Sequence, residues 1–427
     1  MTLELNRRVF LGASASVATF AAVPRQAWAA TPTPDAWDAV RTAMQSFVDR
    51  KYVPGAVGLI ARGTDAPTVL RTGTLAFDSA QPVDENSLFR CYSMTKPVTG
   101  IAAMMLIEDG KLGLDQNIAD FLPGFANPRV MTDPQKNLDS RPARAPITVR
   151  NLLTHTAGLG YTIVTKGPLL EAYFRLGLTP ASASRKPLPG MPPITTAPSL
   201  AEFADRLATL PLIADPGTVW SYSVSLDLLG RVIELASGQS FDAFLQNRIF
   251  APLGMTSTYF QVPQSEIQRL TTNYFGAPFG AFPIDPGSDS VFLDKPAFPF
   301  GGAGLVSSPR DYDRFLAMLM GEGALGDARI MSTETARLAM SNLVHPDTRM
   351  ESFVKGQGFG AGGRVTIAPR DTGEGLGTFG WGGAASTIGW VDRSRGVRAS
   401  GWSQIMTMGD QPFVEGFTKS VYQGAKA

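Results

Sequence analysis

The pattern of apolar positions predicts strands at both ends of the chain. Residues 55–61 form a nearly continuous apolar run, which is typical of a strand that is buried on both faces. Near the other end, two apolar runs at 386–391 and 397–402 flank the turn-forming sequence Asp-Arg-Ser-Arg-Gly at 392–396, and this arrangement predicts a hairpin. The first and last parts of the chain are therefore expected to contribute to a sheet.

Between these strands the apolar positions recur at helical spacing. Val98, Ile101, Ala102 and Met105 follow the i, i+3, i+4, i+7 pattern of an amphipathic helix, and Gly110 stands where a C-cap glycine would end it. Capping residues and the same spacing predict three further helices. These are a helix at about 227–236 that stops at Gly238, a helix that begins after Ser308-Pro309, and a C-terminal helix that stacks Phe413, Phe417 and Val421.

Strands at the two ends with helices inserted between them predict an α/β layer plus an all-α lobe, with a site between the two. The stretches 180–198 and 274–300 are rich in Pro, Gly, Ser or Phe, and we expect both to be lid-like or binding loops. The expected division is an α/β domain from 30–90 and 300–427 and a mainly helical domain at 91–299.

Composition narrows the class of function. Lys and Arg number 38 against 37 Asp and Glu, so no bulk charge attracts nucleic acid, and we expect a small-molecule partner instead. The lone cysteine, Cys91, excludes an intrachain disulfide. Only two histidines are present, so we expect neither a metal site nor another cofactor; His155 is interpreted as a hydrogen-bonded structural residue. The oligomeric state is left open.

The N-terminus resembles a twin-arginine export signal at residues 1–29. Arg7-Arg8 precedes a mildly apolar Ala/Ser stretch that ends in an Ala27-x-Ala29 cleavage pattern. Asn6 stands where Ser or Thr is usual in such signals. No other apolar run approaches the roughly 20 residues that cross a bilayer, so we expect a periplasmic or secreted protein without a membrane span.

The candidate chemistry begins with Ser93-x-x-Lys96 at the start of the helix predicted around Val98. Residues three apart lie on one helix face, so the Lys96 amine can lie beside the Ser93 hydroxyl and accept its proton. Pro97 is tolerated in a first helical turn and independently places the helix start near Ser93. The positive potential of the helix N-terminus favours a developing alkoxide there. Ser93 is therefore the candidate nucleophile.

Two alternatives are weighed against Ser93. Ser352-x-x-Lys355 has the same spacing, but the glycine-rich sequence after it predicts no helix. A Ser-His-Asp triad on an α/β-hydrolase fold would require a Gly-x-Ser-x-Gly elbow, and no such pentapeptide occurs. The base must therefore be a residue other than histidine.

Four segments in the right order resemble class C β-lactamases and the related family VIII carboxylesterases. They are 89–115 with Ser-Met-Thr-Lys-Pro, 147–159 with Leu-Leu-Thr-His-Thr-Ala-Gly-Leu, 216–224 with Trp-Ser-Tyr-Ser-Val, and 379–387 with Trp-Gly-Gly-Ala. The resemblance implies a β-lactamase/transpeptidase-like fold, an antiparallel sheet flanked by helices with an inserted helical lobe.

The resemblance also implies roles for individual residues. Ser93 is the nucleophile, Lys96 its proton acceptor, and Tyr222 the group that shares the proton and returns it to the leaving alcohol. The backbone N–H groups of Ser93 and Ala384 would form the oxyanion hole. Glycines in the third motif would let that strand approach the substrate closely, and the substrate-binding residues implied are Trp381, Gly382, Gly383 and Val224.

Two departures from the sequence motifs of class C β-lactamases favour esters over β-lactams as substrates. Val224 stands where class C β-lactamases have Asn, and Trp381 stands where they have Lys, whose charge helps to hold the β-lactam carboxylate. The prediction is a serine carboxylesterase that cleaves short acyl or aryl esters through an acyl-enzyme. The alternatives are a β-lactamase or D-amino-acid peptidase, an acyltransferase using the same intermediate, and, from a different class, a catalytically silent binding protein.

Overall fold

The structure is a computed structural model that describes residues 37–180, 183–186, 195–277, 280–351 and 353–425. The proposed export signal lies outside the described residues. Within them, no helix is both long and apolar enough to span a membrane.

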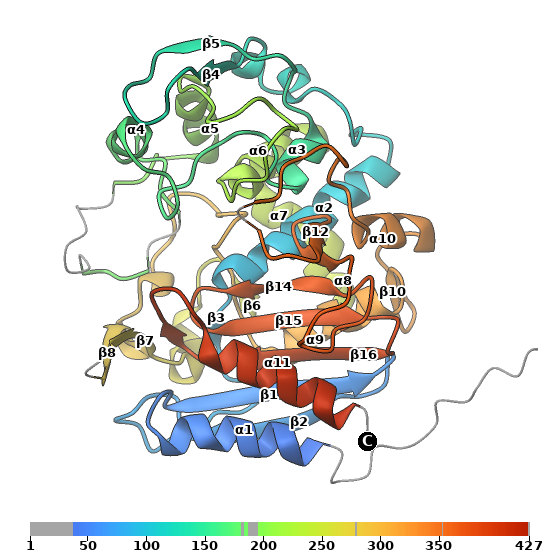
Figure 1. The fold of residues 1–427 in the computed structure, drawn as a ribbon. Helices are drawn as coiled ribbons and strands as arrows, with labels where there is room; N and C mark the ends of the chain where they lie inside the picture. The colour runs from blue at the N-terminus through green and yellow to red at the C-terminus, as the bar shows by residue number, and fades with distance from the viewer. Residues whose placement is uncertain (1–36, 181–182, 187–194, 278–279, 352, 426–427) are drawn as a thin grey trace, which may run out of the picture.

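A seven-stranded antiparallel sheet joins the two ends of the chain (Figure 1). An N-terminal strand pairs with a C-terminal strand, with Ile60 opposite Ala399. The sheet order is β12 (Gln357–Phe359), β13 (Arg364–Thr366), β14 (Phe379–Gly383), β15 (Thr387–Asp392), β16 (Val397–Trp402), β1 (Gly55–Arg62) and β2 (Thr68–Gly73). The strand predicted at 55–61 and the hairpin predicted around 392–396 are confirmed to within one residue.

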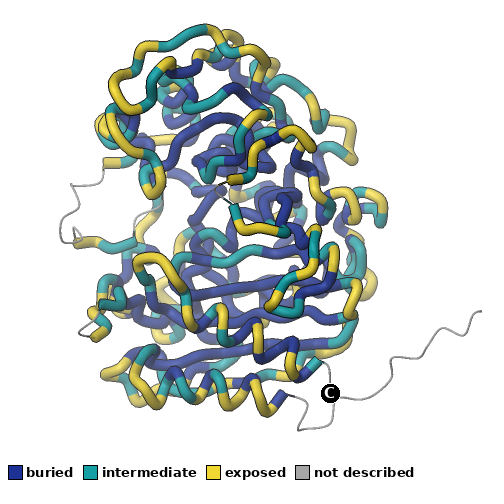
Figure 2. Tube along the Cα trace, in the orientation of Figure 1, coloured by how far each residue is buried: buried dark blue, intermediate teal, exposed yellow. Residues whose placement is uncertain are grey.

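Helices cover both faces of this sheet. On one face α1 (Asp38–Asp49) and α11 (Pro412–Gly424) pack together, and the predicted stack of Phe413, Phe417 and Val421 is buried in their shared core. On the other face lies α9 (Pro309–Met320), which contacts β15 and β16 and is capped by Ser308 as predicted. Figure 2 shows the central strands as buried and the outward side of α1 as exposed.

The central helix α2 (Thr95–Glu108) begins directly after Ser93 and connects the sheet to the helical half of the molecule. Its residues from Thr95 to Leu106 are all buried, so the expectation of an amphipathic helix is wrong. The physical reason is that α6, α7, α10 and the strand β14 all pack against α2. The predicted end of the helix is confirmed, with Gly110 at φ 69°.

The helical half contains six helices in addition to α2 among the described residues. They are α3 (Val149–Leu153), α4 (Pro168–Leu176), α5 (Leu200–Ala208), α6 (Ser225–Ser237), α7 (Phe241–Leu245) and α8 (Ala251–Leu253), while α10 (Thr333–Ala339) follows α9 in sequence. The helix predicted at 227–236 is α6, and the left-handed Gly238 ends it as expected. Single-turn 3-10 helices and a π-helical turn at Gln246–Phe250 complete the helical elements.

Small sheets surround the main one. They are β3 (Phe89–Arg90), β9 (Val306–Ser307) and β6 (Thr258–Tyr259); β17 (Ile405–Met406), β7 (Asn273–Ala277) and β8 (Gly280–Asp285); β4 (Arg129–Met131) and β5 (Ser140–Pro142); and β10 (Ala324–Leu325) and β11 (Ala328–Arg329). The expectation of an irregular loop is wrong for the first half of 274–300, because β7 and β8 pair there as a hairpin, whereas 286–300 contains only two single-turn 3-10 helices. Phe298 and Phe300 are buried in the main core, and Phe282 is exposed. Of 180–198, residues 181–182 and 187–194 lie outside the described part.

Candidate active site

Ser93 lies in a 3-10 turn, Tyr92–Met94, immediately before α2. The preceding residue, Tyr92, has φ 43°, a left-handed conformation that is unfavourable for a bulky side chain. Its ring is buried, and its hydroxyl accepts a hydrogen bond from Asn273 Nδ2 at 3.0 Å, which fixes this turn in place. Ser93 itself is only half-buried, so its hydroxyl is accessible at the end of an otherwise buried segment.

The three predicted reactive side chains converge. Lys96 Nζ lies 3.2 Å from Ser93 Oγ, and the Tyr222 hydroxyl donates a hydrogen bond to the same oxygen at 2.7 Å. Lys96 is completely buried, and its Nζ lies 4.6 Å from the centre of the Tyr222 ring. The serine oxygen is therefore in hydrogen-bond reach of two proton carriers at once, which is the geometry that nucleophile activation needs.

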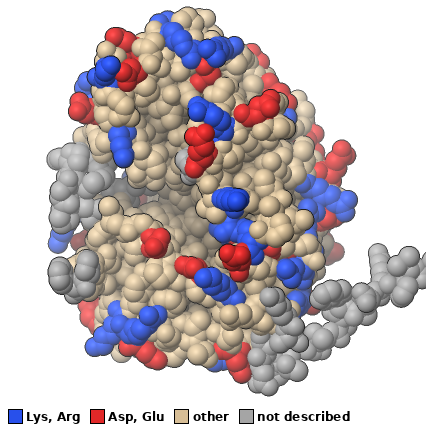
Figure 3. All heavy atoms as spheres, viewed as in Figure 1, with Lys and Arg blue, Asp and Glu red and all other residues tan. Residues whose placement is uncertain are grey.

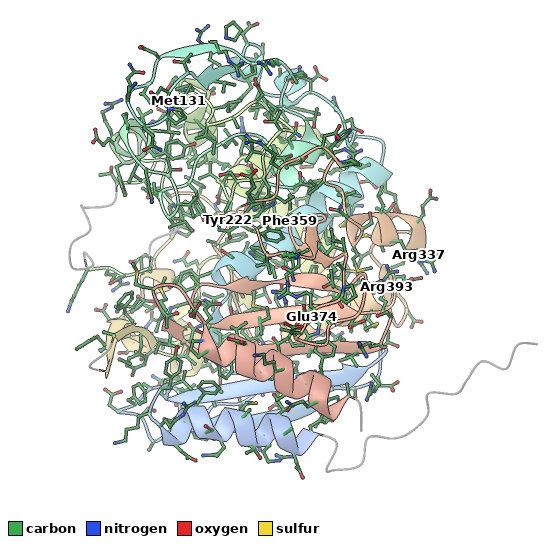
Figure 4. All side chains as sticks on the ribbon, viewed as in Figure 1. Met131, Tyr222, Arg337, Phe359, Glu374 and Arg393 are labelled. Atoms are coloured by element: carbon green, nitrogen blue, oxygen red, sulfur yellow. The ribbon has the colours of Figure 1, made fainter. Side chains whose placement is uncertain are left out.

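Aromatic neighbours hold the Tyr222 ring at the junction of the sheet and the helical half (Figure 4). The ring centres of His155, Tyr161 and Trp381 lie 4.7, 5.3 and 5.9 Å from that of Tyr222. Trp381 Nε1 also donates to the Tyr222 hydroxyl at 3.4 Å. These contacts restrict the phenol to an orientation in which its oxygen points at Ser93.

His155 is buried next to this group and does not contact Ser93. Its Nδ1 accepts a hydrogen bond from the backbone N–H of Ser223 at 3.2 Å, which places the proton of the neutral ring on Nε2. Burial holds the pKa of His155 well below its usual value, and the nearby charge of Lys96 lowers it further. His155 is thus a neutral structural ring that packs against Tyr222.

The strand β14 lies against the segment that precedes Ser93. A Cβ atom at Gly383 would lie 2.3 Å from the carbonyl oxygen of Cys91, so only glycine permits this approach. A Cβ atom at Gly382 would meet nothing closer than 3.2 Å, so the close approach is specific to Gly383. Ala384 follows at the end of β14 and is half-buried, and its part in an oxyanion hole stays a prediction.

The side chain of Val224, a predicted binding residue, packs in the core and does not line a pocket beside Tyr222. Val224 is completely buried at the start of α6, and its side chain belongs to the main hydrophobic core. Its backbone N–H donates to Gly160 O at 3.1 Å, so it helps to hold the segment that carries Tyr222. Ser352, the alternative nucleophile, lies outside the described residues.

A pocket of about 520 Å³ opens beside Tyr222. The surface is hollowed between the two halves of the molecule (Figure 3). Aromatic and aliphatic side chains dominate the pocket wall, and Lys166 is its one cationic residue among those described. The lining residues are Met131, Pro134, Gln135, Val164, Thr165, Lys166, Ile213, Trp220, Ser221, Tyr222, Phe353 and Trp381.

Two residues that the sequence interpretation missed also contact this group. Gly302 O accepts a hydrogen bond from Lys96 Nζ at 2.7 Å, and Gly302 N–H donates to Asp227 Oδ1 at 2.8 Å. Asp227 is only 2% exposed. The available signals were a carboxylate within the apolar run of α6 and a pair of adjacent glycines at 301–302, and neither predicts a contact with Lys96.

Comparison with known proteins identifies the family. A sequence model of the Beta-lactamase family matches residues 40–414. The chain belongs to the beta-lactamase family. The match confirms the family resemblance seen in the sequence. Solved structures that superpose on this chain confirm the expected β-lactamase/transpeptidase-like fold.

Several beta-lactamase-family relatives align over most of this chain. Protein Rv1367c of Mycobacterium tuberculosis (strain ATCC 25618 / H37Rv) is 32% identical over 84% of this chain and 87% of its own. Esterase EstB of Burkholderia gladioli is 31% identical over 83% of this chain and 86% of its own. The solved structure of EstCE1, described as a hydrolase with promiscuous acyltransferase activity, superposes with a TM-score of 0.74 at 26% identity, covering 91% of this chain and 98% of that one.

Within this family fold, the described residues contain no group of three His, Cys, Asp or Glu side chains arranged to hold a metal ion. Cys91, two residues before Ser93, is fully buried, and burial raises the pKa of its thiol above the usual range. The reactive groups that meet at Ser93 are therefore its own hydroxyl, the amine of Lys96 and the phenol of Tyr222, and Tyr222 also lines the pocket.

Proposed function

We propose that this protein is a serine carboxylesterase that hydrolyses short acyl or aryl esters through an acyl-enzyme on Ser93. The observation that carries the proposal is the convergence of Lys96 Nζ and the Tyr222 hydroxyl on Ser93 Oγ, at 3.2 and 2.7 Å. The esterase name of the related EstB, together with the apolar wall beside Tyr222, supports esters as the substrate class.

In the proposed reaction, Ser93 Oγ attacks the ester carbonyl carbon while its proton passes to Lys96. The carbonyl oxygen becomes an oxyanion, which accepts hydrogen bonds from the N–H groups of Ser93 and Ala384. When the carbon–oxygen bond to the alcohol breaks, Tyr222 gives its proton to the leaving oxygen and recovers one from Lys96. Water then attacks the acyl carbon and loses a proton to the same pair. The bond between that carbon and Ser93 Oγ breaks, the pair returns the proton to Ser93 Oγ, and the carboxylic acid leaves.

Trp381 is the proposed reason why esters are preferred to β-lactams. Its half-buried indole lines the pocket at the position where class C β-lactamases carry a lysine. An indole gives apolar contact to an aryl or alkyl ester but offers no charge to a penicillin or cephalosporin carboxylate. The missing cation at position 381 costs that anion on the order of 1–3 kcal/mol in a partly dry cleft, and the exposed Lys166 is the one cationic residue of the pocket wall among those described.

The deciding experiment compares initial rates on p-nitrophenyl acetate, butyrate and octanoate with those on a chromogenic cephalosporin. We expect the short esters to give the highest kcat/KM, and Ser93→Ala to abolish both this activity and labelling by a fluorophosphonate. Ser352→Ala is the matched control and is expected to keep both. If the wild-type protein hydrolyses the cephalosporin faster than every ester, the protein is a β-lactamase; if labelling persists in Ser93→Ala, the nucleophile is wrong.

Acyl transfer to an alcohol is a second candidate function, because the same acyl-enzyme serves water or another acceptor. It is favoured by the apolar pocket next to Tyr222, the proposed proton donor to the alcohol, and by the transferase activity named for EstCE1. Adding a primary alcohol to the p-nitrophenyl butyrate assay tests it. Formation of the new butyrate ester supports transfer, and butyric acid as the sole acyl product contradicts it.

A further inference from the structure

Asp227 is a buried carboxylate for which the proposed reaction has no use. It lies in the first turn of α6, five residues after Tyr222, and only 2% of its surface is exposed. Burial raises the pKa of this carboxyl, and the charge of Lys96 and the N–H of Gly302 oppose that rise. A buried carboxylate costs stability unless a cation and hydrogen-bond donors compensate it, so its partners indicate its role.

Those partners form a continuous connection to Lys96. Asp227 Oδ1 accepts the Gly302 N–H at 2.8 Å, and the carbonyl of the same glycine accepts Lys96 Nζ at 2.7 Å. The carboxylate therefore fixes one side of the Gly302 residue while the lysine binds the other. A Cβ atom at position 302 would lie 2.5 Å from Asp227 Oδ2, so only glycine fits between them.

The rest of the glycine-rich segment 300–305 is held against α2 by similar bonds. Thr99 Oγ1 donates to Gly301 O at 2.7 Å, and Leu305 N–H donates to Thr95 Oγ1 at 3.1 Å. Because these hydrogen bonds hold the segment against α2, which begins directly after Ser93, the Gly302 carbonyl has a defined position relative to the nucleophile. Among the described residues, Asp227 is the only carboxylate that accepts a hydrogen bond from this segment.

The other titratable groups around Lys96 do not replace this charge. The centres of the Tyr161 and Tyr222 rings lie 5.5 and 4.6 Å from Lys96 Nζ, and His155 is held neutral by burial. The strand β14 has no charged residue. The helices α7 and α10, which also pack against α2, keep their charged side chains Asp242, Glu334 and Arg337 exposed.

We propose that Asp227 is a positioning residue for the nucleophile: it holds Gly302 so that the Gly302 carbonyl anchors Lys96 beside Ser93. The inference rests on the proposed function, in which Lys96 accepts the Ser93 proton. Asp227 touches neither substrate nor Ser93 and acts through Lys96 alone.

The test is the pH dependence of two reactions of Ser93 in the full-length protein. One is kcat/KM for p-nitrophenyl butyrate, and the other is the rate of labelling by a fluorophosphonate, which needs an activated serine but no ester cleavage. Asp227→Asn keeps an oxygen for the Gly302 N–H and removes the charge. Asp392→Asn is the matched control, because Asp392 is also completely buried and accepts a backbone N–H, from Gly375 at 2.7 Å, at the far end of β15.

Removing the buried negative charge favours the less protonated form of the site. In Asp227→Asn we expect the acidic limb of both profiles to move to lower pH by about one unit. We expect the plateau above that limb to fall by about threefold to tenfold, because Lys96 is held less firmly beside Ser93. Asp392→Asn is expected to keep the wild-type pH profile of both reactions, even if it lowers the Tm of the protein.

An Asp227→Asn profile that coincides with those of the wild type and Asp392→Asn would overturn the inference. If Asp227→Asn does not fold, Gly302→Ala provides the second variant, because its methyl group displaces the Asp227 carboxylate. We then expect slower labelling of a folded protein, and an unchanged labelling rate contradicts the inference. Failure of the wild-type protein to be labelled at all would instead overturn the proposed function, and this inference with it.

Discussion

At the scale of single residues, the environment of a side chain decides its chemistry more than its identity does. Ser93 directly precedes α2, and Ser307 lies opposite Phe89 in the strand before it. Ser307 is completely buried and hydrogen-bonded to Thr258, whereas Ser93 is half-exposed between an amine and a phenol. The left-handed Tyr92 directly precedes Ser93, whose hydroxyl lies in hydrogen-bond reach of Lys96 and Tyr222. His155 shows the opposite outcome, because burial makes a potentially reactive ring structural.

The burial of His155 leads to a prediction of how the stability of the protein depends on pH. Its pKa in the folded protein lies well below the ordinary value of about 6.5, so the unfolded chain binds a proton that the folded protein does not. The contribution of neutral His155 to the free energy of unfolding should therefore be fully present above pH 6.5. As the pH drops from 6.5 toward the folded-state pKa, the free energy of unfolding should fall by at most about 1.4 kcal/mol per pH unit.

Thermal unfolding from pH 8 to pH 4.5 checks this prediction. We expect His155→Gln to be less stable than the wild type at pH 8 and to lose less Tm on acidification. His345→Gln is the control, since His345 is exposed and pairs only with Asp347. Parallel Tm curves for the wild type and His155→Gln would show that the neutral ring has no part in the acid sensitivity.

At the scale of elements, the site depends on three segments that meet at the start of α2. β14 approaches the Cys91 carbonyl through Gly383, the segment before α6 presents Tyr222, and the glycine-rich segment 300–305 binds Lys96 through Gly302. Each close approach requires a glycine or a buried polar group at a defined position. A substitution that keeps the reactive residues but shifts one of these segments should therefore reduce activity.

β14 provides the prediction on specificity. Trp381→Lys replaces the indole of the pocket wall by a cation, so kcat/KM for p-nitrophenyl butyrate should fall and that for a carboxylated cephalosporin should rise by roughly tenfold to a hundredfold. Leu376→Lys adds the same charge at an exposed position outside the pocket and should change neither rate. Equal effects of the two variants would exclude a local role for position 381.

The position of Val224 modifies this expectation. From the sequence, Val224→Asn would add a polar partner for the β-lactam amide. Because Val224 is completely buried in the core, an asparagine there would instead leave an amide in apolar surroundings at a cost of about 1–3 kcal/mol. We therefore expect Val224→Asn to lower Tm and to give no gain on cephalosporins.

At the scale of the whole molecule, the fold is closed by pairing of its two ends. β1 pairs with β16, and α1 packs on α11, so the sheet is complete only after the segment Val397–Trp402 has been made. The single thiol of Cys91 is buried, so no disulfide has to form before or after export. Both features suit a route that exports folded proteins, which is the proposed role of residues 1–29.

Export is the prediction at this scale. Replacing Arg7 and Arg8 by Lys should leave the precursor in the cytoplasm, because the arginine pair is the signal that the twin-arginine pathway recognises. Fractionation followed by esterase assay and immunoblotting of both compartments measures the outcome. Substitution of Arg25 alone by Lys is the control and should leave export unchanged. Equal periplasmic activity of the double variant and the wild type would contradict the twin-arginine assignment.

Local sequence alone determined the strands at both ends, the helix that follows Ser93, and the Ser93–Lys96 spacing. These features depend on interactions within a few residues, since residues three apart on a helix share a face wherever the helix lies. The burial of α2 on every side and of Val224 in the core depended on what packs around them, which periodicity does not record. The contacts of Ser93 with Tyr222, 129 residues away, and of Lys96 with Gly302, 206 residues away, exist only in the tertiary structure. The family resemblance predicted the first of these. The second could not be predicted, because a backbone carbonyl carries no side-chain signature and takes its position solely from how the whole chain packs.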